Sequence, residues 1–227
     1  MPIPAEVAEI PQKSVRVLVY EQLRDWIIQG VLAPGEKISD KDIATRFDIS
    51  KTPVREAFQT LEAQKLIQTF PRKETRVTEL LTDNIEELYL PIIALEELSV
   101  SLACKHIQDA DILRLEALNK DVANVAATGD PLIIMRTDRT FHDAITEIAR
   151  NSYVRDFLET LQCGVQRLEY IFFKQGFALE NSFNNHEQLI DALRRRDEKT
   201  ASAIIRQQWV YSMEKLTAIL NEQKSPD

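Results

Sequence analysis

The chain has 227 residues, a formal net charge of −8 at pH 7 and 44% hydrophobic residues. This length and apolar content suit one large globular domain or two small ones, and they exclude wholesale disorder. With only two cysteines, the chain is not a disulfide scaffold. No apolar run is long enough to cross a membrane, and the first 12 residues contain no secretory leader. These features predict a cytoplasmic protein without membrane association.

Charge is distributed unevenly along the sequence. Residues 1–78 carry 12 basic and 11 acidic side chains, whereas residues 79–227 carry 16 basic and 25 acidic ones. A nearly neutral front joined to an acidic back predicts two modules, 1–78 and 79–227, with different partners. The first module alone would tolerate the phosphate backbone of a nucleic acid.

The first module is predicted to hold three helices followed by a hairpin. Its elements are expected as helices over 15–29, 40–47 and 53–64 and as strands over 66–70 and 75–78. Asp40 and Thr52 are the expected N-caps of the second and third helices, and Pro53 suits the first position of the third. This order of elements predicts a winged helix-turn-helix.

A winged helix-turn-helix offers the first turn of its third helix to the DNA groove. Hydroxyl and basic side chains occur at the starts of the second and third helices and at the hairpin tip, where phosphates and bases would meet them. The predicted DNA-contacting residues are Lys41, Ser50, Lys51, Thr52, Arg55, Arg72 and Lys73. A twofold homodimer of such modules would read an inverted repeat in double-stranded DNA.

The run from Ser50 to Ala57, Ser-Lys-Thr-Pro-Val-Arg-Glu-Ala, closely resembles the GntR family of bacterial transcription regulators. The resemblance spans about the first third of the chain and implies a DNA-binding regulator, more often a repressor than an activator. In one respect the sequence differs from the family, because Glu74 stands in the wing where glycine is usual. An acid beside a phosphate is unfavourable for a wing contact.

The acidic part is predicted to be an all-α bundle of six helices, large enough to enclose a cavity. The helices are expected over 83–106, 109–128, 131–150, 153–174, 182–196 and 198–222. Their expected N-caps are Asp83, Asp109, Asp130, Ser152, Ser182 and Asp197. The inward stripe of the first is predicted to contain Ile85, Leu88, Ile92, Leu95, Leu98 and Leu102.

Two histidines and an aspartate in this bundle are candidate metal ligands. Asp138 and His142 are four residues apart and share one face of a helix, and His186 lies on another. Such a set on facing helices can hold a divalent ion. The alternative is that Asp138 and His142 merely pair with each other. A catalytic metal with Glu187 as general base would make the chain a metal-dependent hydrolase, and a regulatory ion would make it a metal sensor.

The segments Asp138-x-x-Phe141-His142 and His186-x-x-Leu189 resemble the FCD ligand-binding domain of FadR-type GntR regulators. Six helices would place the chain in the VanR-like branch. The resemblance implies a divalent metal, such as zinc, nickel or manganese, on the aspartate and the two histidines. It also implies a small effector, often a carboxylate.

Two positions depart from the FCD pattern. Gln208 stands where the family has a further histidine ligand, and an amide oxygen is a weaker ligand than imidazole. Ile92 stands where arginine is frequent, so Arg139, Arg167 and Gln208 are the candidate effector-binding residues. An aromatic cluster is expected in the core or a dimer interface, with the effector pocket as the alternative, and it contains Tyr170, Phe172, Phe173 and Phe177.

Overall fold

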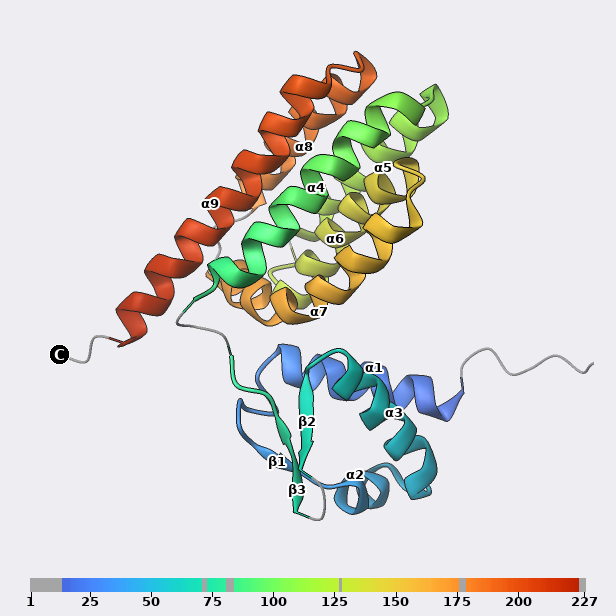
Figure 1. Ribbon diagram of the computed structural model, residues 1–227, viewed down its shortest axis with the longest axis vertical. Helices are drawn as coiled ribbons and strands as arrows, with labels where there is room; N and C mark the ends of the chain where they lie inside the picture. Colours follow the sequence, from blue (N-terminus) through green and yellow to red (C-terminus); the bar gives the residue numbers. More distant parts are fainter. Residues whose placement is uncertain (1–13, 71–72, 81–83, 127, 176–178, 225–227) are drawn as a thin grey trace, which may run out of the picture. The chain divides into compact units, whose positions relative to one another are not determined.

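The computed structural model describes residues 14–70, 73–80, 84–126, 128–175 and 179–224. The chain divides into two compact units, Met1–Glu79 and Leu80–Asp227 (Figure 1). The first contains helices and a small sheet, and the described part of the second contains helices alone. This architecture confirms the predicted fold class, a winged helix-turn-helix followed by an all-helical bundle.

Within its described residues, the N-terminal unit has three helices and a three-stranded sheet. Its elements are α1 (Val15–Ile28), β1 (Lys37–Ile38), α2 (Asp40–Phe47), α3 (Lys51–Ala63), β2 (Ile67–Phe70) and β3 (Glu74–Val77). The antiparallel sheet has the order β1-β3-β2, so Arg76 of β3 faces Lys37 on one side and Gln68 on the other. The sequence did not predict β1, because two residues are too few to show an alternating pattern.

A small apolar core fixes the orientation of α3. Leu23 and Ile27 of α1 pack with Val54 and Leu61 of α3, and all four are at most 1% exposed. Burying each such side chain contributes about 1.5–3 kcal/mol. One face of α3 is thus held against α1, and its opposite face is left to solvent.

Serines rather than the predicted residues precede the second and third helices. Ser39 instead of Asp40 is the N-cap of α2, and Ser50 instead of Thr52 is that of α3. Both serines have an extended backbone, the conformation that an N-cap needs. Pro53 consequently lies in the third helical position and not in the first.

The C-terminal unit contains six helices within its described residues. They are α4 (Glu86–His106), α5 (Asp109–Ala126), α6 (Pro131–Ile148), α7 (Ser152–Lys174), α8 (Leu179–Arg194) and α9 (Glu198–Lys224). Asp130 caps α6 as predicted, since its carboxylate accepts hydrogen bonds from two backbone N–H groups of the first turn. Asn151 and not Ser152 caps α7, and Ser182 lies inside α8. The predicted cap Asp83 lies outside the described residues.

The central helix of this unit is α4, which packs against α6, α7 and α9, while α5 packs against α6 and α8 (Figure 1). The predicted inward stripe of α4 is wrong at Leu98, which is 44% exposed. Tyr89, Glu96 and Ser99 are fully buried instead. No helix in the described ranges is long and apolar enough to cross a membrane.

Candidate functional site

The exposed first turn of α3 carries most of the predicted DNA-contacting residues. Ser50, Lys51, Thr52 and Arg55 are all exposed there, and Lys41 is exposed on the first turn of α2. The unpaired backbone N–H groups of a helix start also favour phosphate oxygens. This surface therefore combines hydroxyl groups, two cations and a helix N-terminus.

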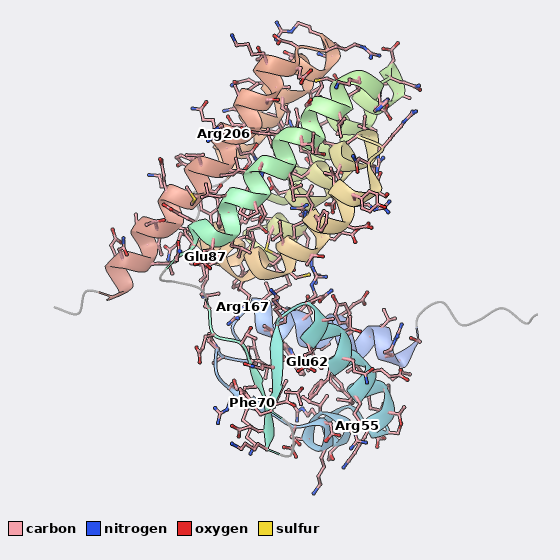
Figure 2. The ribbon with its side chains drawn as sticks, in the orientation of Figure 1. Arg55, Glu62, Phe70, Glu87, Arg167 and Arg206 are labelled. Carbon is pink, nitrogen blue, oxygen red and sulfur yellow. The ribbon has the colours of Figure 1, made fainter. Side chains whose placement is uncertain are left out.

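A groove of about 710 Å³ lies between α3 and the hairpin of β2 and β3. Figure 2 shows its walls, with Arg55 and Glu62 on α3 and Phe70 on β2. Lys73 at the hairpin lines the same groove. The structure thus brings a predicted recognition-helix residue and a predicted wing residue to one groove, whereas Arg72 lies outside the described residues.

An acidic residue of α2 holds the Arg55 side chain. Arg55 Nε donates a hydrogen bond of 2.6 Å to Asp40 Oδ2. This bond and the guanidinium charge lower the pKa of Asp40, so the carboxylate stays ionised. The bond engages Nε, whereas a bidentate contact with guanine uses two guanidinium nitrogens on one edge. Asp40 therefore orients the Arg55 side chain and occupies its Nε–H donor, which is then not available to a base.

The acid in the wing is paired with cations. Glu74 accepts a 2.6 Å hydrogen bond from Arg76 Nε, and its other oxygen lies 3.5 Å from Lys37 Nζ. The Arg76 hydrogen bond lowers the pKa of Glu74. Neighbouring charge therefore offsets the repulsion that an acid at this position would exert on a phosphate.

Inside the helical unit, two helices bring the predicted metal ligands together. Asp138 and His142 lie on α6, and His186 lies on α8. His142 Nε2 is 3.7 Å from Asp138 Oδ2, and His186 Nε2 is 3.6 Å from Asp138 Oδ1. One possible ligand atom from each residue lies within 4.8 Å of the others. An ion between them would have two nitrogen ligands and one oxygen ligand.

Gln208 of α9 completes this cluster. Its Nε2 lies 3.4 Å from His142 Nε2 and 3.3 Å from His186 Nε2. Rotation of the amide by half a turn exchanges nitrogen and oxygen, which have almost the same shape. Gln208 can therefore donate to the two imidazoles or present an oxygen to a cation among them.

Asn119 of α5, which the sequence did not single out, fixes the His186 ring. The Asn119 side-chain N–H₂ donates to the Phe183 carbonyl at 3.2 Å, which orients the amide. Its Oδ1, an acceptor only, lies 3.1 Å from His186 Nδ1. The proton must therefore sit on Nδ1, and the Nε2 lone pair faces Asp138. This is the tautomer that binds a metal ion through Nε2.

Burial sets the charge of the cluster. His142 is 3% exposed and His186 is 0% exposed. Burial lowers the pKa of His142 well below its usual range and that of His186 to about 3, so both rings are neutral. Burial, followed by the charge of Glu169, raises the pKa of Asp138 to about 7. Neutral imidazoles with a carboxylate suit divalent transition ions.

A cavity of about 30 Å³ adjoins the cluster, which is room for an ion with a water molecule. It is lined by Tyr89, Asp138, His142, Glu169, Phe172, Phe173, Ser182, Gln208, Trp209 and Ser212. Organic ligands usually need at least ~300 Å³, so an effector must displace side chains to enter. Phe172 and Phe173 are buried and also line this cavity, so core packing and an effector pocket both stay open for the aromatic cluster. Phe177 lies outside the described residues.

The structure does not bring the two predicted arginine anchors to this cavity. Arg139 Nε donates to Asp143 Oδ1 at 2.9 Å, and Arg139 Nη2 lies 3.7 Å from Glu96 Oε1. Arg167 is 6% exposed on α7, where Figure 2 labels it, and it is not among the lining residues. Position 139 points about 100° around α6 from Asp138, which explains why only Asp138 lines the cavity.

Comparisons with known proteins assign both units. Residues 16–77 match the bacterial regulatory proteins of the gntR family, and residues 87–209, just over half of the chain, match the FCD domain. The transcriptional repressor RspR of Escherichia coli K12 is 29% identical over 188 residues, 82% of each chain. The probable D-xylose utilization operon transcriptional repressor of Paenarthrobacter nicotinovorans is 28% identical over 197 residues, covering 84% of this chain and 85% of that one.

A solved structure shows the same fold. The structure of E. coli McbR/YncC has a TM-score of 0.75 and 22% identity, and the match covers 94% of this chain and 100% of that chain. The matching families and relatives are transcription regulators and not enzymes. The VanR-like branch stays a prediction. With its winged helix-turn-helix and its helical FCD unit, the chain belongs to the GntR family of bacterial transcription regulators.

Proposed function

We propose that this regulator is a ligand-responsive repressor that binds an inverted-repeat operator as a homodimer. The observation that carries the DNA-binding part is the exposed first turn of α3, where Arg55 shares a groove with Lys73. Repression is supported by the relatives RspR and the probable D-xylose operon regulator, both named as repressors. Footprinting on DNA upstream of the regulator's own gene and its neighbours should show two protected half-sites about one helical turn apart.

Exposed apolar side chains on two packed helices support the homodimer. Leu90 and Leu98 of α4 are 50% and 44% exposed, and Tyr153 and Phe157 of α7 are 76% and 60% exposed. Leu90 and Leu98 are eight residues apart and therefore lie on one stripe of α4. Large apolar side chains gathered on one pair of helices favour a protein–protein contact, and a second copy is the partner that an inverted repeat needs.

We further propose that a divalent ion such as zinc, nickel or manganese binds to Asp138, His142 and His186, with Gln208 beside them. Charge supports this proposal as well as geometry. Four carboxyl groups, on Glu96, Asp138, Asp143 and Glu169, interact with the single Arg139 guanidinium. When ionised they leave three negative charges uncompensated, and a divalent ion would offset two of them. The ion would supply positive charge that binds and polarises an effector oxygen.

Metal stoichiometry tests this part directly. Elemental mass spectrometry of tag-free protein should find about one divalent ion per chain, and Asp138→Ala and His142→Ala should lose it. No metal in the wild-type protein after incubation with zinc, nickel and manganese would contradict the proposal. Thermal unfolding of each variant distinguishes ligand loss from misfolding.

The hydrolase alternative is not favoured. Glu187, its proposed general base, is exposed and lines a separate surface cleft between α5 and α8. The metal-sensor alternative differs from our proposal only in making the ion itself the signal. Operator binding that changes on adding the ion alone would favour the sensor.

A further inference from the structure

The walls of the bundle cavity contain acidic and aromatic side chains but no lysine or arginine among the described lining residues. Glu169 of α7 lies there together with Asp138. Glu169 therefore lines a cavity whose described walls offer its carboxylate no cationic side chain. A ligand that relied on a carboxylate alone would add negative charge beside Glu169.

Two hydrogen-bonding groups in the same walls have no partner among the described residues. They are the Tyr89 hydroxyl, on a residue that is 0% exposed, and Trp209 Nε1–H, on a residue that is 5% exposed. The two rings contact each other edge to face, with centroids 5.9 Å apart. An indole N–H can only donate, and a buried donor without an acceptor costs about 1–3 kcal/mol. A ligand with a hydrogen-bond acceptor could therefore satisfy the Tyr89 hydroxyl and the Trp209 N–H.

We propose that the effector is a small amino-carboxylate, whose protonated amine meets Glu169 and whose carboxylate accepts from Tyr89 and Trp209. This inference deepens the proposed function and rests on it. A zwitterion adds no net charge to the cavity, and the aromatic rings of Phe172 and Trp209 favour a cation next to their faces. Since the cavity has a volume of only about 30 Å³, the ligand must be small and must displace side chains.

Three probes of matched size test the proposal by isothermal titration calorimetry. L-alanine carries both groups, propylamine carries the amine alone and propionate carries the carboxylate alone. The full-length protein is used with one equivalent of Mn²⁺, which amino acids bind weakly and so do not strip. Wild-type protein should bind alanine at least about 10-fold more tightly than either single-group probe, since each charged hydrogen bond contributes that much or more.

Glu169→Gln keeps the side-chain shape and removes the charge, so it should weaken alanine binding about 10-fold or more. It should not weaken propionate binding, because the variant also lacks the negative charge that repels a lone carboxylate. Glu159→Gln, an exposed change on the same helix, should alter neither. Propionate binding as tightly as alanine, equal alanine binding by the Glu169→Gln variant, or no binding of any probe would overturn the inference. Operator binding is measured on the same samples. Operator binding without alanine binding would overturn only the inference about the effector, whereas loss of both would count against the proposed function as well.

Discussion

Arg55 is the side chain that we expect to read DNA sequence most directly. Arg55→Ala should weaken operator binding by about 1–3 kcal/mol and relax base preference at one position of each half-site. Fluorescence anisotropy with the operator and its single-base variants measures both effects. Arg16→Ala, which removes an exposed cation of α1 outside the groove, is the matched control. Unchanged base preference in the Arg55 variant would remove this residue from the recognition surface.

Asn119 offers a second test at the scale of single residues. Because its amide fixes the tautomer of His186, Asn119→Ala should lower metal affinity about 10- to 100-fold. Asn119→Asp keeps an acceptor toward Nδ1 and should retain most of the affinity. Lys120→Ala, an exposed change on the same helix, should have no effect. Chelator competition gives the affinities, and equal values for Asn119→Ala and wild type would show that the ring needs no such support.

That Asp138, His142 and His186 lie close together was largely predictable from sequence, and the surroundings of this cluster were not. Asp138 and His142 share a helical face by spacing alone, and His186 and Gln208 were aligned through the family resemblance. Asn119 lies 67 residues before His186, and no local pattern links the two. Glu169 looks like a solvent-exposed helical acid until the packing of α7 turns it toward the cavity.

At the scale of helices, buried Glu96 makes α4 sensitive to pH. Burial raises its pKa to about 7, because the Arg139 nitrogen at 3.7 Å is too distant for a hydrogen bond and does not offset the lost hydration. In the unfolded chain its pKa is about 4.3. Between these values the folded protein keeps a proton that the unfolded chain has released, so stability falls as pH rises through this range.

Glu96→Gln should therefore stabilise the metal-free protein at pH 8, by on the order of 1–3 kcal/mol, and change it little at pH 4.5. Urea unfolding at the two pH values measures the difference, with Glu159→Gln as the exposed control. Equal effects of Glu96→Gln at both pH values would show that the carboxylate is already ionised and compensated in the fold.

The exposed leucines of α4, Leu90 and Leu98, predict how the proposed homodimer responds to substitution. Leu98→Glu places a charge among apolar side chains and should convert a dimer to monomers in light scattering. Leu113→Glu, an equally polar change at a 66% exposed position of α5, should leave the dimer intact. A wild-type protein that is already monomeric, or a Leu98 variant that stays dimeric, would exclude this face as the interface.

The periodicity of apolar residues predicted the positions of the helices well. It did not predict their N-caps or the buried face of α4. Neighbouring polar residues, such as Ser39 and Asp40, are chemically equivalent candidates for an N-cap, and the extended backbone of the serine decides between them. On α4 the buried face is broad because α6, α7, α8 and α9 all contact it. A single stripe of apolar residues therefore could not show that Glu96 is buried or that Leu98 is exposed.

The whole molecule joins a DNA-reading unit to a helical unit that we propose binds a ligand. Binding in the bundle can change operator affinity only as far as the ligand prefers one of two states of the protein. The near-neutral first unit and the acidic second unit confine DNA attraction to the first. Operator binding should consequently weaken with rising salt, according to the number of phosphates that the first unit contacts.

Selection of genomic fragments with the purified full-length protein is the sharpest test of sequence-specific DNA binding through α3. The enriched fragments should share one inverted repeat, and the Arg55→Ala variant should enrich it much less. Enrichment without a shared repeat, or equal enrichment of the same repeat by the Arg55→Ala variant, would contradict sequence reading through α3.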